Sequence, residues 1–322
     1  MASPNVSEII TTTLESRSGV LADNFSKNTA LLLRLKEKDN IVPVSGGYEI
    51  REEIAYTENT TVQSYSGYEE FDISPQDVFT SATFPWAQYV VSVSISGLEE
   101  LMNSGKEAKI DLISARIDNA EKSLLNRMST DLYLDGTGNS GKNLLGLGAA
   151  IPDNPATGVY ASINRATWSF WRSQKFAAVA DGSAAISSST IVPHMTRTFI
   201  KCVRGREKPD LVVFDDVFFT AFVASFEGKQ YVTDTKMAEA GFLNVKFMGA
   251  DVVLDGGFGG AATASHGWFL NTNYIRLRPH KDRDMKSLGK RNSVNQDATV
   301  EAIAWAGNLT CRNCALQGVL IA

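Results

Sequence analysis

The segment from residue 41 to residue 95 has a composition that one folded subunit cannot easily bury. It reads as a series of strands, yet it carries eight carboxylates against a single base, Arg51, and it has no lysine. It is too apolar and too rich in β-forming residues to be a disordered acidic tail. A two-stranded ribbon is only marginally stable alone in water. We therefore expect the segment to project from the body and to be completed by a neighbouring chain. Its aromatic residues include Tyr48, Tyr56, Tyr65, Tyr68, Phe71, Phe79, Phe84 and Trp86.

The rest of the composition is that of an ordinary soluble globular protein. The chain has 322 residues, of which 43% are hydrophobic and 21% charged, and its formal net charge is −5. A single core stops growing at about this length, so we expect two subdomains with appendages. The mild acidity does not indicate a nucleic-acid-binding surface. No apolar run is long enough to span a membrane, and the first residues lack the pattern of a secretory signal.

The strongest periodic signal lies in residues 107–133. Apolar residues recur there at intervals of three or four, which is the spacing of one face of a helix. This pattern predicts a long amphipathic helix of roughly seven turns, about 40 Å long. The positions are Ile110, Ile113, Ile117, Ala120, Leu124, Met128 and Leu132.

Weaker signals predict the other elements. We expect strand-like arms at residues 48–56 and 61–65, joined by a turn at Glu58 and Asn59, and a strand at 88–95. Further helices are expected at 27–38, 165–174, 193–204 and 216–225. Further strands are expected at 211–214, 245–254, 268–277 and 299–322, the last of these packing back on the long helix.

A glycine-rich loop follows the long helix. Its residues Gly136 to Gly141 match G-x-G-x-x-G, and with Lys142 they resemble a Walker A loop. Both phosphate-binding arrangements need the glycines after a strand and before a helix. Asn143 also stands where a Walker A loop has Ser or Thr. We therefore interpret the loop as the end of a helix, with a nucleotide-binding enzyme as the alternative.

No other motif indicates catalysis, a cofactor or a metal. Cys311 and Cys314 have zinc-ligand spacing, but a second such pair is missing, so we expect buried, reduced thiols. The histidines, His194, His266 and His280, fall in no catalytic or metal-binding pattern. No catalytic, cofactor-binding or metal-binding residue is assigned.

Residues 276–291 form a basic run with seven bases and two acids. Such a run is usually a solvated loop. It could also be the surface on which the acidic segment of an adjacent subunit lies, because opposite charges set register and association rate at interfaces. The candidate inter-subunit contacts are Glu49, Glu52, Glu53, Glu69, Glu70, Arg276, Arg278, Lys281 and Arg283.

Four local sequences resemble one family of phage proteins. They are TVQSYSGY at 61–68, VSVSISGLEE at 91–100, NSGKEA at 103–108, and DGTGNSGK at 135–142 followed by Gly146 and Leu147. Together with the order of elements, they resemble the major capsid protein of tailed bacteriophages, which has the Hong Kong 97-type fold. The local resemblance covers roughly residues 40–175, and beyond that it is architectural.

This resemblance implies an α+β fold and a structural function. The chain would self-assemble into pentamers and hexamers of an icosahedral head around packaged double-stranded DNA, without an active site and without sequence-specific DNA binding. Assembly would take place in the bacterial cytoplasm, with portal, scaffolding and decoration proteins as further partners. The implied layout is an N-terminal arm (1–47), an extended loop (48–90), a peripheral domain with the long spine helix (91–194), an axial domain (195–294) and C-terminal strands returning to the peripheral domain (295–322).

This sequence departs from the family pattern in two ways. Some relatives crosslink through a lysine of the extended loop, and this loop has none, so we expect no such crosslink. Some relatives carry a long N-terminal scaffolding region that is proteolysed, whereas the arm here is short, so we expect scaffolding to be a separate protein or absent. An encapsulin-type compartment, which has the same fold but encloses a protein cargo, is a further alternative.

Overall fold

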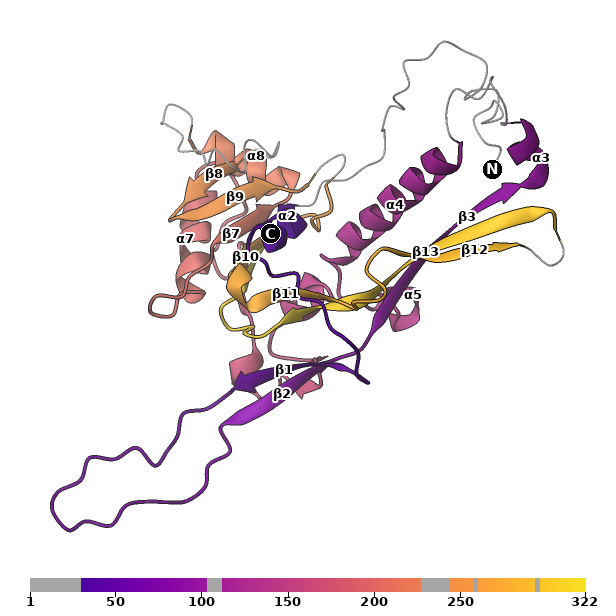
Figure 1. The fold of residues 1–322 in the computed structure, drawn as a ribbon. Helices are drawn as coiled ribbons and strands as arrows, with labels where there is room; N and C mark the ends of the chain where they lie inside the picture. The colour runs from indigo at the N-terminus through magenta and orange to yellow at the C-terminus, as the bar shows by residue number, and fades with distance from the viewer. Residues whose placement is uncertain (1–29, 103–111, 227–243, 257–259, 293–295) are drawn as a thin grey trace.

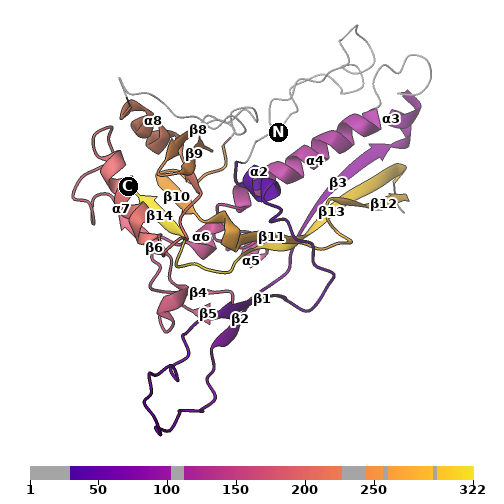
Figure 2. The same ribbon diagram turned by 60° about the vertical axis from the view of Figure 1, so that its left-hand side comes forward.

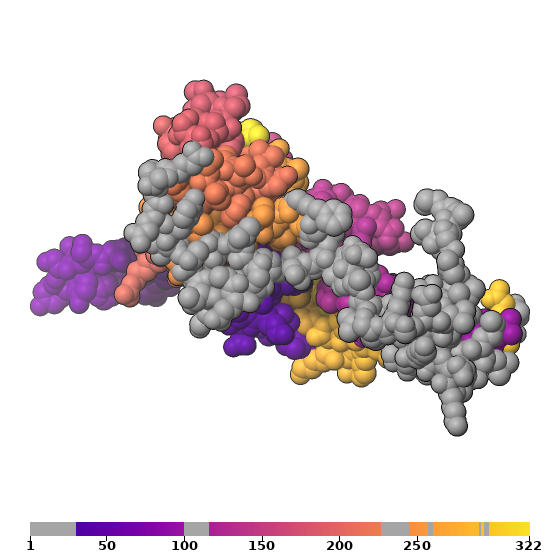
Figure 3. All heavy atoms as spheres, turned by 90° about the horizontal axis from the view of Figure 1, so that it is seen from above, coloured from indigo at the N-terminus to yellow at the C-terminus, as the bar shows by residue number. Residues whose placement is uncertain are grey.

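The computed structural model describes residues 30–102, 112–226, 244–256, 260–292 and 296–322. Two sheets with their helices form the body, and a pair of strands with the long loop between them projects away from it (Figure 1). The view from above shows an elongated molecule with this loop at one end (Figure 3). The predicted projection is therefore present in the single chain.

The long helix is present as α4 (Leu112–Asp131). Ala120, Leu124 and Met128 of the predicted stripe are buried, as the periodicity requires. The helix lies along strand β3 (Ala87–Ser96) (Figure 1). The expected start of the helix, including Ile110, falls outside the described residues.

Strand β13 (Ala298–Cys311) organises the first sheet. One of its edges pairs with β3 from Ala87 to Ser96, and other strands pair along its length. These are β11 (Ile275–Pro279) and β12 (Lys286–Asn292), both antiparallel to β13. The basic run therefore consists of two strands, each paired with β13, and the turn between them, so the solvated-loop interpretation was wrong. The described charged side chains of these strands are exposed or half-buried, so the composition resembled that of a solvated loop.

The second sheet has mixed strand directions. The strand order is β6-β14-β10-β7-β9-β8, with parallel pairing for β6–β14 and β7–β9. Helices α7 (Ile191–Lys201) and α8 (Asp216–Ala224) flank it (Figure 2). The side chain of Asp215 begins α8 by accepting a hydrogen bond from the Phe218 amide, which is a typical N-cap. The strands are β6 (Gln174–Ala177), β7 (Leu211–Phe214), β8 (Asn244–Phe247), β9 (Ala250–Leu254), β10 (His266–Leu270) and β14 (Gly318–Ile321).

The helix expected at 165–174 is not formed. A short 3₁₀ turn η1 (Ser169–Trp171) and then β6 occupy that stretch. The Trp171 indole N–H donates to the Tyr160 carbonyl at 3.0 Å, so burial of this large side chain overrides local helix propensity. The remaining short elements are α3 (Gly97–Met102), α5 (Gly138–Gly141), α6 (Leu147–Ala150), β4 (Val159–Tyr160), β5 (Ile163–Asn164) and η2 (Thr272–Tyr274).

The base of the projection is a ribbon whose second strand differs from the prediction. Strand β1 (Ile50–Ala55) pairs with β2 (Phe79–Phe84) and not with residues 61–65. Ile50 and Ile54 are buried on one face, so the ribbon packs on the body. Between the strands, residues 56–78 form no strand or helix and make up what we call the tip loop.

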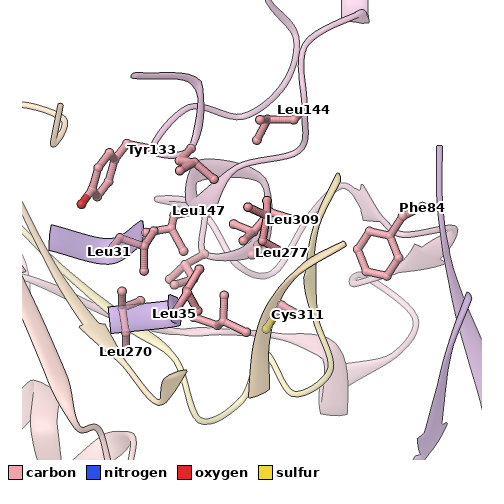
Figure 4. Packing of buried hydrophobic residues seen from close by; sticks show 14 of the residues in the cluster. Leu31, Leu35, Phe84, Tyr133, Leu144, Leu147, Leu270, Leu277, Leu309 and Cys311 are labelled. Atoms are coloured by element: carbon pink, nitrogen blue, oxygen red, sulfur yellow. The ribbon is translucent and has the colours of Figure 1, made fainter. Parts of the chain in front are cut away.

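Two buried clusters make up the core. The larger joins helix α2 (Ala30–Glu37) to the body, with Leu31 and Leu35 packed near Leu147 and Leu277 (Figure 4). The smaller lies in the second sheet and is rich in phenylalanine. Two clusters are compatible with two subdomains, although the predicted boundaries stay predictions.

Candidate assembly surface

The tip loop exposes large apolar side chains. The side chain of Val62 is 84% exposed, that of Ile73 is 91% exposed, and that of Tyr68 is fully exposed. Single exposed apolar residues are normal on a protein surface, but several on one projecting loop mark an interaction site. The loop can therefore bury these side chains only against another molecule.

Short-range hydrogen bonds shape the tip loop. The Asn59 carboxamide oxygen accepts from the amide and the hydroxyl of Thr61, at 2.9 and 2.7 Å. Asp72 accepts in the same way from Ser74, at 2.9 and 2.6 Å, and these hydrogen bonds lower the pKa of the Asp72 carboxyl. Such turns are a known property of Asn and Asp side chains. The loop therefore presents a charged, locally ordered surface.

The base of the ribbon holds a buried carboxylate. Glu52 is 5% exposed, and its two oxygens each lie 3.4 Å from an arginine Nε, that of Arg278 on one side and of Arg312 on the other. The Thr310 hydroxyl also donates to Glu52 at 3.2 Å. Glu52 and Arg278 were both predicted as contacts between subunits, but they contact each other within one chain.

The other predicted contacts lie apart in the single chain. Glu53 is exposed on β1, Glu69 and Glu70 are exposed on the tip loop, and Lys281 and Arg283 are exposed on the turn between β11 and β12. Glu49 and Arg276 are half-buried. Among the described residues no ion pair joins any of these seven side chains to another. Their role between subunits stays a prediction.

Sequence reasoning missed an aromatic groove at the root of the tip loop. Tyr56 contacts Trp168 and Phe170, with ring centroids 5.6 Å apart in both pairs. Together with Phe79 they line a groove of about 440 Å³. Assigning Trp168 to a helix hid its proximity to the loop.

Sequence reasoning also missed the attachment of α2 to the second sheet. Arg34 Nε lies 3.4 Å from Asp210, and Arg34 Nη2 lies 3.2 Å from Asp251. Lys38 Nζ lies 2.8 Å from the same oxygen of Asp210. Charges of opposite sign therefore hold α2 to the body.

The glycine-rich loop follows α4, as predicted, and no strand precedes it. Its short helix α5 contains Asn139 and Ser140 at positive φ. Gly136 has φ +82°, and a side chain there would meet the Leu144 carbonyl. The strand–loop–helix arrangement for phosphate binding is thus absent at this loop.

Within the described ranges the structure has neither a metal-binding cluster nor a membrane-spanning helix. No group of three His, Cys, Asp or Glu side chains is placed to hold a metal ion there. None of the described helices is both long and apolar enough to cross a membrane.

Comparison with known proteins finds likeness in structure but not in sequence. No family model and no curated protein matches the chain. The cyanophage A-1(L) capsid asymmetric unit matches with TM-score 0.71 at 16% identity, covering 99% of this chain and 98% of that chain. The capsid of cyanophage P-SCSP1u matches with TM-score 0.60 at 12% identity, covering 100% and 96%. The capsid of Myoviridae phage XM1 matches with TM-score 0.58 at 12% identity, covering all of both chains.

Proposed function

Since the chain has the Hong Kong 97-type fold of these phage capsid chains, we propose that it is a major capsid protein. It self-assembles into pentamers and hexamers of an icosahedral head around packaged double-stranded DNA. The tip loop carries this proposal, because it exposes apolar side chains that a single chain leaves in water. The role is structural, and the chain is not an enzyme.

The proposed layout is the one that the resemblance implies. Within it, β11 and β12 pair with β13 of the first sheet, and β14 joins the second sheet. Residues 1–47 are the arm, 48–90 the extended loop, 91–194 the peripheral domain, 195–294 the axial domain and 295–322 the returning strands. Helix α2, held by Asp210 and Asp251, supports the position of the arm. The aromatic cluster of the second sheet supports a unit in the region of the axial domain, although the cluster also includes Phe176 and Leu320 from outside 195–294.

Exposed charges guide neighbours into register. Glu53, Glu69 and Glu70 lie on the projection, and the exposed cations Lys281 and Arg283 lie on the body. Exposed pairs contribute only about 0–1 kcal/mol each, but a shell repeats them in every subunit. We propose that the projection of one subunit lies against basic side chains of the next, while apolar contacts supply most of the affinity.

Portal, scaffolding and decoration proteins are further proposed partners, and the mature location is the virion after assembly in the bacterial cytoplasm. An encapsulin-type shell is the second candidate, because it has the same fold. The contents of purified particles, DNA or protein cargo, separate the two.

The experiment is size-exclusion chromatography and electron microscopy of the expressed full-length protein. We expect closed shells or capsomers. A well-folded monomer of 35.0 kDa that stays monomeric at high concentration, alone and with the other head proteins, would contradict the proposal.

A further inference from the structure

A second groove lies where the projection joins the first sheet, and we call it the Trp86 groove. Its volume of about 330 Å³ is at the lower end of the range for binding pockets, so its size suits a single side chain. Its lining includes the rings of Trp86 and His280, whose centroids are 5.4 Å apart, and the cation Arg283. The other lining residues are uncharged, and they are Gly46, Gly47, Gln88 and Ala306.

Hydrogen bonds fix both rings of the Trp86 groove. The Trp86 indole N–H donates to the Gly47 carbonyl at 2.9 Å, and His280 Nδ1 accepts from the Asp282 amide at 3.1 Å. Arg283 is exposed, and among the described residues no acid forms an ion pair with it. A site whose rings are already in place loses less conformational entropy on binding. The groove is therefore ready to receive an aromatic ring that carries a carboxylate beside it.

The tip loop carries such a pair of side chains. Tyr68 is fully exposed and lies in a tight turn, in which the Glu69 amide donates to the Ser66 carbonyl at 3.4 Å. The Ser66 amide in turn donates to the Glu69 carboxylate at 3.0 Å. Glu70 follows and is exposed, and residues 56–78 contain five acids and no base. The turn thus presents an aromatic ring next to negative charge.

The tip loop and the Trp86 groove lie at opposite ends of the ribbon within one chain. The tip loop joins β2 at Phe79, whereas Trp86 follows the other end of β2 at Phe84. Figures 1 and 2 both show the loop pointing away from the body. A ring from this loop can therefore reach such a groove only on a second copy of the chain.

We propose that Tyr68 of one subunit inserts its ring into the Trp86 groove of a neighbouring subunit, where Glu70 pairs with Arg283. The proposal rests on the proposed capsid function and names the receiving site of the tip loop within it. Aromatic rings attract each other beyond the burial of their area, and Trp, Tyr and Arg are the residues that dominate binding at interfaces. The ion pair sets the register of the ring.

Charge and aromatic content favour this groove over two others. The groove lined by Tyr56 and Trp168 contains Asp77 and no cation, so it would repel the acids beside Tyr68. A third groove, of about 480 Å³, contains Arg127 and Lys142 but only one aromatic ring. Of the three, the Trp86 groove is the one that combines two aromatic rings with a cation.

The first test maps contacts in assembled particles with a carbodiimide, which joins a carboxylate to a primary amine only where the two touch. Arg283→Lys supplies the amine and keeps the charge. We expect the peptide map to show an amide between Glu70 and residue 283, and Glu70→Gln should abolish it. Particles mixed from isotope-labelled and unlabelled subunits should show the link between two chains. Particles in which Glu70 links only to other lysines, or to none, would overturn the proposal.

The second test measures the protein concentration at which shells form. Tyr68→Ala removes the ring, and Gln88→Trp places a large ring at the rim of the groove. Each should raise this concentration about tenfold or more. Because both variants remove the same contact, the double variant should lose little more than either single one. Tyr68→Phe keeps the ring and should assemble like wild type.

Both changed positions are exposed, so urea unfolding of the unassembled subunit should match wild type and separate association from folding. Additive losses in the double variant, or normal assembly of either single variant, would overturn this contact and leave the capsid function intact. A wild-type protein that never assembles would contradict the capsid function, and this contact with it.

Discussion

The base and the tip of the projection are both acidic, yet their carboxylates differ in burial and in ion pairing. Glu52 at the base is buried between two arginines of its own chain. Glu69 and Glu70 on the tip loop are exposed and make no ion pair among the described residues. The base therefore belongs to the fold of the subunit, whereas we propose that the tip contacts a neighbouring subunit. Acidic composition alone does not distinguish these roles, because the distinction depends on whether a side chain faces the body of the subunit or the solvent.

The largest expected effect comes from Glu52→Ala. Removing one partner of a buried ion pair typically costs about 3–5 kcal/mol, and we expect about 3 because Arg312 stays partly exposed to water. Urea unfolding of the unassembled subunit measures it. Glu53→Ala on the exposed face of the same strand is the matched control and should change stability by less than about 0.5 kcal/mol. Equal losses for the two variants would remove the contrast between buried and exposed acids.

The second-largest effect is expected from the exposed apolar side chains of the tip loop. Val62→Ser and Ile73→Ser should each weaken association by about 1.5–3 kcal/mol, the value of burying such a side chain, and should leave subunit unfolding unchanged. Sedimentation and electron microscopy measure assembly. Ser64→Ala on the same loop is the control. Normal shells from the double variant would show that these side chains stay in water.

A smaller effect is expected for the exposed acids of the projection. Changing Glu53, Glu69 and Glu70 together to Lys should slow or misdirect assembly, because each exposed pair contributes about 0–1 kcal/mol. Light scattering should show wild-type assembly slowing as salt rises, since exposed charges are screened beyond about 8 Å at physiological ionic strength.

A reciprocal variant makes this test specific. Lys281→Glu with Arg283→Glu should also slow assembly, and mixing the two charge-reversed proteins should restore part of the rate. If the triple variant forms normal shells at the normal rate, its acids serve solvation and not recognition.

The smallest effect is expected at Lys142, which lies in neither region. Lys142→Ala should leave assembly intact and stability within about 0.5 kcal/mol. No nucleotide should bind at millimolar concentration in a calorimetric titration. Binding that depends on Lys142 would favour the enzyme alternative over a capsid role.

Local sequence patterns predicted the helices and strands that form wherever a regular spacing or a β-forming segment is present. The three- and four-residue spacing predicted α4, and segments that contain several β-branched residues predicted β3 and β7. The partner of β1 was wrong, because the turn at Glu58 and Asn59 suggested a short hairpin, whereas pairing with β2 spans the whole tip loop.

The buried role of Glu52 was also missed, although a signal existed. Ile50, Glu52 and Ile54 alternate with exposed residues, and side chains two apart lie on one face of a strand. Glu52 therefore shares the buried face of the two isoleucines. Its arginine partners stand more than 200 residues later in the sequence, and no local pattern connects them.

The long pairing of β3 with β13 has a mechanical consequence. Strand β2 leads directly into β3, whose residues Ala87 to Ser96 form ten consecutive registered pairs with β13. Hydrogen bonds in an antiparallel ladder run perpendicular to the strands. A pull directed along β3 therefore loads the ladder in shear, and the pairs bear the force together instead of opening one after another.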